Sequence, residues 1–143
     1  MKEINELKEL FNSQKLAVLA TYNKNQPHGC LVAFASSGDL KHLLFATKRN
    51  TRKYNDIYLN TRVAMLIDNR SNRESDFEQA VAVTAKGSAR EPDSSQRDKW
   101  KALYISKHPQ LAAFVNNPDV VVIRIDVEEY CIAGFNSTHF IKL

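Results

Sequence analysis

The alternation of apolar and polar residues along the chain predicts a succession of short β-strands with a few helices between them. Apolar residues that alternate with polar ones, or that form short runs bounded by turn residues, predict strands over 16–22, 28–36, 42–47, 61–68, 79–90, 119–134 and 137–143. Apolar residues spaced three or four positions apart predict helices over 3–13, 52–59 and 94–107, with a further short helix after Pro109. Residues 69–78 are polar and mixed in charge, and we expect them to form a loop.

The long strand over 119–134 carries a regular inward and outward alternation. Its apolar positions, which are predicted to face the core, are Val121, Ile123, Ile125 and Val127. The polar positions predicted to face water are Arg124, Asp126 and Glu128. Short strands joined by tight turns are typical of an antiparallel meander. We therefore expect an α+β fold: an antiparallel β-barrel of six to seven strands, closed or partly open, with peripheral helices.

Length and composition are those of one soluble globular domain. The chain has 143 residues, of which 43% are hydrophobic and 25% charged, and neither a repeat nor a linker divides it, so 1–143 is expected to be a single domain. Cys30 and Cys131 lack metal-ligand spacing and are predicted to be reduced core thiols. The four histidines are not spaced for a metal either. The charged start and the short apolar runs predict a cytoplasmic protein without a membrane partner.

Cations gather where the strand over 42–47 ends and the helix over 52–59 begins. They are Lys48, Arg49, Arg52 and Lys53. The unpaired N–H groups at a helix start favour a phosphate, and Thr47 and Thr51 add hydroxyl donors. Arg52 can bind phosphate oxygens through two N–H groups, and Lys53 adds a point charge. The segment 47–53 is therefore a candidate phosphate site, and a solvated run of surface charge is the alternative.

A resemblance to a known family is carried by two stretches, Phe45-Ala46-Thr47-Lys48-Arg49-Asn50-Thr51-Arg52-Lys53 and Arg62-Val63-Ala64-Met65-Leu66. In this order they resemble the pyridoxamine 5'-phosphate oxidase-related family, whose members are FMN-binding split-barrel proteins. The strand from Leu16 to Thr21, the Pro27-His28 turn and Gly87 fit the same pattern, so the resemblance covers most of the chain.

The resemblance implies a homodimer with FMN at the interface between the subunits. The cofactor-binding residues that it implies are Thr47, Arg52, Lys53, Thr51, Lys48, Arg49, Leu31, Val32 and Ala33. The six residues of the 47–53 segment belong to the phosphate end, with Lys48 and Arg49 as supporting charges. The other three belong to the strand over 28–36, whose backbone lies against the flavin ring. Asn69, after the 61–68 strand, is a candidate polar contact, and an ordinary surface turn is the equally good alternative.

The sequence also departs from the true oxidase of that family. Cys30 and Ala35 stand where the oxidase has Arg and Lys, and Ala82 stands where it has Gln. The C-terminal Arg-x-His clamp of the oxidase is missing from the stretch that ends at Leu143. Because these groups hold pyridoxine phosphate in the oxidase, that activity is not expected for this chain.

These features predict an FMN-dependent oxidoreductase that acts on a small-molecule substrate or electron donor. No side chain stands out as a catalytic acid or base, so no catalytic residue is assigned. The alternative is a binding protein without turnover that holds flavin, haem or deazaflavin. A nucleic-acid module is disfavoured, because the basic cluster lacks interleaved exposed aromatic residues. Trp100, Tyr104 and Phe114 are expected to be core or dimer contacts.

Overall fold

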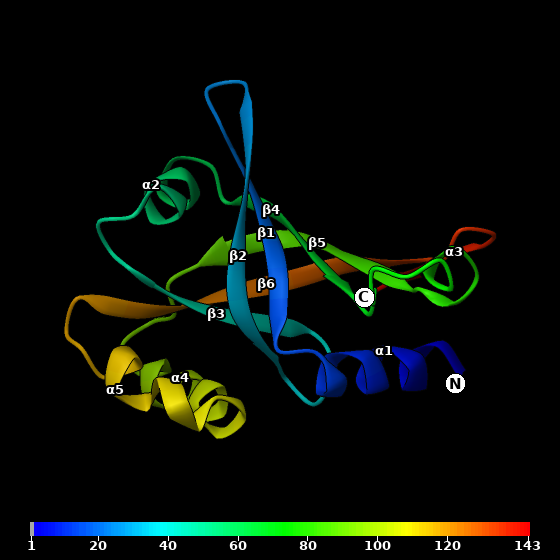
Figure 1. Ribbon diagram of the computed structural model, residues 1–143. Coiled ribbons are helices and arrows are strands. Elements are labelled where there is room, and N and C mark those ends of the chain that lie inside the picture. Colours follow the sequence, from blue (N-terminus) through cyan, green and yellow to red (C-terminus); the bar gives the residue numbers. More distant parts are fainter. Residues whose placement is uncertain (1) are drawn as a thin grey trace.

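The computed structural model describes residues 2–143 and contains seven strands and five α-helices in that range (Figure 1). The strands are β1 (Leu16–Asn23), β2 (Gln26–Ser36), β3 (His42–Lys48), β4 (Arg62–Asp68), β5 (Ala82–Arg90), β6 (Val120–Ala133) and β7 (Thr138–Lys142). The helices are α1 (Lys2–Ser13), α2 (Arg52–Leu59), α3 (Asp76–Gln79), α4 (Arg97–Lys107) and α5 (Ala112–Val115), with a 3₁₀ turn over Pro109–Leu111. No helix in the described range is long and apolar enough to cross a membrane.

The strands form one antiparallel sheet in the order β3-β2-β1-β4-β5-β6-β7. An additional pairing of β3 with β6 closes the first six strands into a barrel, and β7 extends the sheet beyond β6. The predicted antiparallel barrel of six to seven strands with peripheral helices is therefore confirmed. Alternate residues of each strand point inward, and those that fill the interior include Leu19, Phe34, Phe45, Met65, Ile67, Val83, Ile123 and Ile125.

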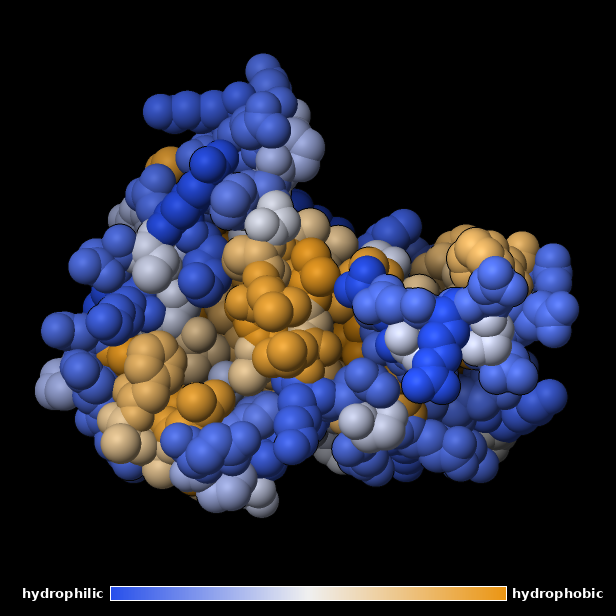
Figure 2. Space-filling view, viewed as in Figure 1, coloured by the Kyte–Doolittle hydropathy of each residue, from blue (hydrophilic) through white to orange (hydrophobic). Residues whose placement is uncertain are grey.

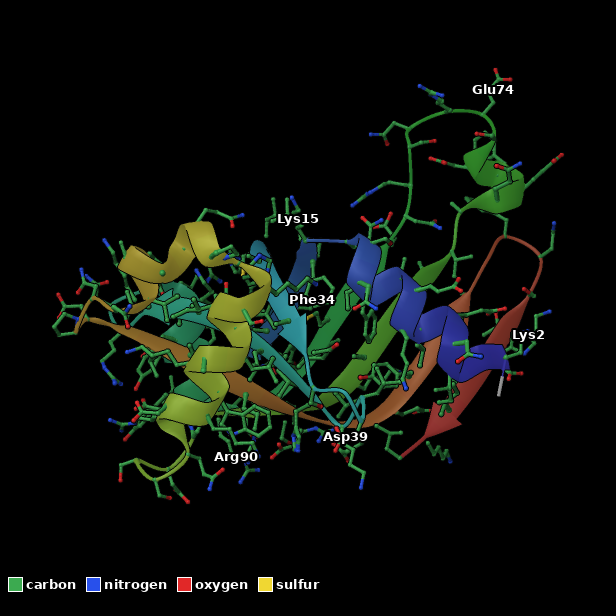
Figure 3. The ribbon with its side chains drawn as sticks, turned by 90° about the horizontal axis from the view of Figure 1, so that it is seen from below. Lys2, Lys15, Phe34, Asp39, Glu74 and Arg90 are labelled. Atoms are coloured by element: carbon green, nitrogen blue, oxygen red, sulfur yellow. The ribbon has the colours of Figure 1, made fainter. Side chains whose placement is uncertain are left out.

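Helix α1 covers one side of the barrel interior, as its apolar spacing predicts. Leu7, Leu10 and Phe11 are buried, and the Phe11 ring meets the edge of Phe34 with centroids 5.7 Å apart. Phe34 also touches α4, because the Lys107 ammonium lies 3.8 Å from its ring centroid. Phe34 therefore packs between the two helices, which both lie in front of the sheet in the view from below (Figure 3).

A second, smaller core lies outside the barrel, where α4 and α5 pack on β2, β3 and β6. Its buried members are Ala35, Leu44, Trp100, Tyr104, Val115 and Val122. This layer corrects the prediction that the polar face of β6 is solvated. Arg124 and Asp126 are half-buried beneath it, with the Arg124 guanidinium 5.7 Å from the Trp100 ring centroid, and only Glu128 is fully exposed.

The loop expected over 69–78 contains the start of the short helix α3, and β5 begins at Ala82 rather than at residue 79. Asp76 stabilises this arrangement locally, because its carboxylate accepts hydrogen bonds from the backbone amides of Ser71 and Asn72. Four residues make too short an amphipathic pattern to be recognised in a polar sequence. The loop that carries α3 and Glu74 extends away from the barrel (Figure 3).

Gly87 lies where β5 bends over β6, at a register shift between Lys86 and Gly87. A Cβ atom at this position would lie 2.1 Å from the carbonyl oxygen of Asp126, which is backbone and cannot rotate away. The close approach of two strands therefore requires a glycine here.

We expect Gly87→Ala to lower the free energy of unfolding by about 3 kcal/mol, because one strand must shift to admit the methyl group. Gly38→Ala is the matched control, since a Cβ there meets nothing within 4 Å, and its effect should stay within about 0.5 kcal/mol. Urea unfolding followed by the fluorescence of Trp100, the one tryptophan of the chain, measures both. Equal stability of the two variants would contradict the assignment.

Candidate functional site

The barrel opens between β2 and β3. These strands pair only over three positions, from Ser36 with Leu43 to Phe34 with Phe45. Beyond that point β3 stays with β6 along its whole length, from His42 to Lys48, whereas β2 stays with β1. We call the resulting separation, between residues 29–33 of β2 and residues 46–48 of β3, the split.

The split leaves one edge of β2 without a neighbouring strand. The backbone amide of Phe34 donates to the carbonyl of Lys15, on the β1 side. Because successive residues of a strand direct their peptide groups to opposite edges, those of Leu31 and Ala33 face the split. The split therefore presents the Leu31 peptide group and the Ala33 amide, whereas the Ala33 carbonyl accepts a hydrogen bond from Tyr104.

The segment 47–53 lies where β3 leaves the split and α2 begins. Thr51 is the N-cap residue of α2, and its hydroxyl accepts a hydrogen bond from the amide of Tyr54. The hydroxyl oxygens of Thr47 and Thr51 are 2.7 Å apart. Thr47 is buried and Thr51 is half-buried, so the Thr47 hydroxyl contacts the Thr51 hydroxyl from the protein interior. The predicted juxtaposition of two threonines and a helix start is therefore present.

The four cations of the segment point to different partners. Arg49 forms an ion pair with Glu91, whose carboxylate oxygens lie 2.6 and 3.1 Å from its two terminal nitrogens. Tyr54 and Arg97 also donate hydrogen bonds to Glu91. This cluster fastens the segment to the connection between β5 and α4, so the Arg49 charge is already compensated. Within residues 2–143, Lys48 and Lys53 form no ion pair.

Arg52 is oriented by Asp56, one helical turn further along α2. The Arg52 Nε atom lies 3.7 Å from the Asp56 carboxylate, which also accepts hydrogen bonds from the Thr21 hydroxyl at 2.9 Å and the Asn23 amide at 3.2 Å. Asp56 is buried, so these contacts fasten α2 to β1. Sequence reasoning missed Asp56, and the available signal was its i,i+4 spacing from Arg52.

Cys30 connects the segment to β2. Burial raises the pKa of its thiol, the neighbouring Lys53 ammonium opposes that rise, and Asp56 adds to it. Asp56 also binds Thr21 of β1, which pairs with His28 of β2, so α2 lies close to the strand that carries Leu31, Val32 and Ala33. The structure thus brings the predicted phosphate residues and the predicted ring strand together, although about 20 residues separate them in the sequence.

The three predicted ring-contact residues point in two directions. Val32 is buried in the barrel, whereas the Leu31 side chain is 64% exposed on the outer face of the sheet. Leu31 pairs with Val18, which pairs with Leu66 on the other side, and directly opposed residues share a face. An apolar surface therefore runs across β2, β1 and β4, and it forms the central patch in Figure 2.

Asn69 does not join the other predicted residues within one chain. It lies at the end of β4 that is remote from α2, where its side chain accepts a hydrogen bond from the amide of Val81 at 2.8 Å. Two cavities, of about 720 and 690 Å³, also lie at this end, beside Phe135. Neither cavity is lined by a cation of the 47–53 segment. The candidate phosphate site is therefore identified by its hydrogen-bond donors and charges rather than by either cavity.

A family model described as pyridoxamine 5'-phosphate oxidase matches residues 4–131. A heme binding protein from Mycobacterium smegmatis has a similar structure, with a TM-score of 0.84 and 15% identity over 96% of this chain and 56% of that one. This chain therefore spans little more than half the length of that protein. No curated protein matches the sequence.

Two further solved structures have similar lengths. General Stress Protein 26 from Bacillus anthracis is 23% identical, with a TM-score of 0.74 and complete coverage of both chains. A FAD-binding protein from Mesorhizobium loti is 16% identical, with a TM-score of 0.71 and 90% coverage of both chains. At these identities the likeness shows a shared fold.

The Glu91 cluster predicts a pH dependence of stability. Hydrogen bonds from Arg49 hold the pKa of the Glu91 carboxyl below its ordinary 4.5, so the ion pair contributes stability above that pH and loses it as the pH falls through the lower, folded value. We expect Glu91→Gln to be less stable than the wild type at neutral pH, with the difference shrinking below about pH 4. Urea midpoints across this range measure it. Glu9→Gln, an exposed substitution, is the control, and parallel curves for wild type and Glu91→Gln would contradict the role.

Proposed function

This chain belongs to the pyridoxamine 5'-phosphate oxidase family, and on that premise we propose that it binds FMN, with the phosphate at the 47–53 segment and the flavin ring in the split. The observation that carries the proposal is the pair of threonine hydroxyls 2.7 Å apart at the start of α2, beside Arg52 and Lys53. A flavin-binding family and a phosphate-type donor set thus coincide in one place.

The phosphate end is supported by the chemistry of its donors. Thr51 caps the start of α2, and its hydroxyl proton goes to the Lys48 carbonyl. The first amides of the helix, next to the exposed Arg52 guanidinium, are the groups that favour an anion. Asp56 accepts from the Arg52 Nε side and leaves the two terminal nitrogens of Arg52 for phosphate oxygens. Lys53 adds a second charge, Lys48 supports it from solvent, and Arg49 serves the Glu91 cluster that holds the segment in place.

The ring end is supported by the free edge of β2. The Leu31 peptide group and the Ala33 amide face the split and can hydrogen-bond to the polar edge of an isoalloxazine ring. Val32 contributes through its backbone, since its side chain lies in the core. Backbone recognition explains how Cys30 and Ala35 can replace the Arg and Lys of the oxidase without removing the ring site.

A bound flavin supplies hydride or electron transfer, so we propose an oxidoreductase whose protein residues bind and orient the cofactor. Its substrate is a small molecule or an electron donor other than pyridoxine phosphate, because the residues that would hold pyridoxine phosphate are replaced at Cys30, Ala35 and Ala82. The two free thiols suit a reducing compartment such as the cytoplasm.

The apolar outer face supports a homodimer with the flavin at its interface. Leu16 and Leu31 are large exposed apolar side chains on this face, and burying apolar surface contributes about 25 cal/mol per Å². A second copy that covers the face also covers the split, which lies beside Leu31. Asn69 is too remote from α2 to contact a flavin bound by its own chain. We propose that in the dimer it contacts the flavin of the partner subunit.

Haem is the second candidate, because a heme binding protein shares the fold with a TM-score of 0.84. Haem would use the same apolar face and would need an axial ligand, whereas the hydroxyl and amide donors at α2 match a phosphate. The absorbance spectrum of the purified protein separates the two, since flavin and haem absorb differently. A colourless protein that binds neither on addition would reject both.

We expect the double variant Arg52→Ala/Lys53→Ala to bind FMN about 10- to 100-fold more weakly than the wild type, because charge-assisted hydrogen bonds to the phosphate are lost. Riboflavin lacks the phosphate, so its affinity should not change. Lys8→Ala/Lys15→Ala removes the same charge from exposed positions elsewhere and is the matched control. Fluorescence titration of each flavin measures the affinities, and unchanged FMN affinity in the Arg52/Lys53 variant would reject the phosphate assignment.

The outer face yields a separate test of the dimer. We expect Leu16→Asp to shift the protein from dimer to monomer in sedimentation experiments, because a charge would be buried in an apolar contact. Leu59→Asp on α2 is the matched control, since Leu59 is 55% exposed and Leu16 is 51% exposed. A wild-type protein that sediments as a monomer would overturn the proposed interface.

A further inference from the structure

The split begins at one particular pair of residues. The β2–β3 ladder ends with Phe34 opposite Phe45, and the next pair in the same register would be Ala33 opposite Ala46. The Tyr104 hydroxyl donates a hydrogen bond of 3.0 Å to the carbonyl of Ala33. Ala46 packs against the same core cluster as Tyr104, and its backbone amide lowers the pKa of the Tyr104 hydroxyl. These are the carbonyl and the amide that would bind each other if the ladder continued. A side-chain oxygen thus stands between the two strands at the point where they part.

Tyr104 is held firmly in this position. It comes from α4, is 2% exposed and packs in the second core with Leu44 and Trp100. His108 lies one turn further, with its ring centroid 5.1 Å from that of Tyr104 and its Nε2 atom 2.7 Å from the carbonyl oxygen of Phe34. Burial raises the pKa of Tyr104 to about 12, so the hydroxyl keeps its proton at neutral pH and can donate to Ala33.

Both strands are long enough to continue pairing past this point. β2 extends from Ala33 back to Gln26, and β3 extends from Ala46 to Lys48. An exposed strand edge gains free energy by pairing, about 0.5–1.5 kcal/mol for each hydrogen bond, so an open split needs something to maintain it. Tyr104 reaches this point from α4: it bonds to Ala33 of β2 and packs in the second core with Leu44 of β3, with Ala46 beside it.

We propose that Tyr104 is a positioning residue whose hydroxyl binds the Ala33 carbonyl, holds β2 and β3 apart and keeps the Leu31 peptide group and the Ala33 amide free for the flavin ring. This inference rests on the proposed flavin function, and it names the side chain that keeps the ring end of the flavin site open. Tyr104 acts through the two strands and does not itself touch the reacting atoms. Its effect therefore falls on the ring end of the site, while the phosphate end at Thr51, Arg52 and Lys53 is left intact.

The test is Tyr104→Phe, which removes the hydroxyl and keeps the packed ring. Ala33 and Ala46 then lose their shared partner, and the cheapest way to satisfy them is the direct ladder bond, because an unsatisfied buried polar group is costly. We expect FMN and riboflavin to bind about tenfold more weakly, by the same factor, because both need the ring site. In Arg52→Ala/Lys53→Ala, by contrast, only FMN binding should weaken.

Tyr130→Phe is the matched control. Tyr130 is also fully buried and also donates to a backbone carbonyl, that of Leu40 at 2.5 Å, but it lies in the barrel core away from the split. It should lose a similar amount of stability in urea and keep its affinity for both flavins. A loss of flavin affinity in Tyr130→Phe equal to that in Tyr104→Phe would show a general effect of stability and overturn the proposal.

A measurement without flavin completes the test. In NMR spectra of the flavin-free wild type, we expect cross-strand contacts between Phe34 and Phe45 and contacts of the Tyr104 ring with both Ala33 and Ala46. In Tyr104→Phe, a direct hydrogen bond from Ala46 to Ala33 should form and slow the exchange of the Ala46 amide. A direct Ala33–Ala46 bond in the wild type would overturn the proposal without reference to any variant.

The outcomes separate this inference from the proposed function. If the wild type binds neither flavin, the proposed function fails, while the NMR contacts still test the role of Tyr104 in the fold. If the wild type binds FMN and a folded Tyr104→Phe binds it equally well with an unchanged Ala46 amide, the role of Tyr104 is rejected and the flavin proposal stands.

Discussion

Closure of the barrel through β3 and β6 is the constraint on which the rest of the structure depends. β3 pairs with β6 at every position from His42 to Lys48, and this pairing removes the open edges that a meander of six strands would otherwise expose. The direction that β3 must take to reach β6 carries it away from β2 after three pairs. Closure thus sets where β2 and β3 begin to part, and the remaining elements, with Tyr104 of α4 at the point of separation, are arranged around the split.

Two groups of helices then surround β3, one on its outer face and one at its C-terminal end. α4 and α5 cover the outer side of β2, β3 and β6 and bring Tyr104 to the start of the split. α2 follows directly from the end of β3 and is fastened to β1 through the contacts of Asp56 with Thr21 and Asn23. The Glu91 cluster connects these two groups, because Arg49 precedes α2 and Arg97 begins α4. A helix start with free cations is therefore fixed beside a free strand edge.

The same barrel is shared by proteins that are named for binding different molecules, and the fold alone does not choose among their ligands. The choice rests on particular groups of this chain. Hydroxyls and amides at the start of α2 are suited to a phosphate, whereas the outer sheet face around Leu31 is suited to an apolar partner surface. The positions at which this chain departs from the oxidase, Cys30, Ala35 and Ala82, all lie outside the 47–53 segment.

The sequence by itself determined the strands, the barrel class and the position of the candidate phosphate site, because alternation, helical spacing and turn residues are local signals. The inward positions Val121, Ile123, Ile125 and Val127 follow from period two alone. Arg124 and Asp126 were assigned wrongly to solvent, since a helix from elsewhere in the chain covers them. Tertiary structure alone decided that Arg49 pairs with Glu91, that Asp56 meets Thr21 and that Tyr104 binds the Ala33 carbonyl. Each of these contacts joins residues 35 to 71 positions apart, and such pairings are set by how the barrel closes rather than by any pattern within one element.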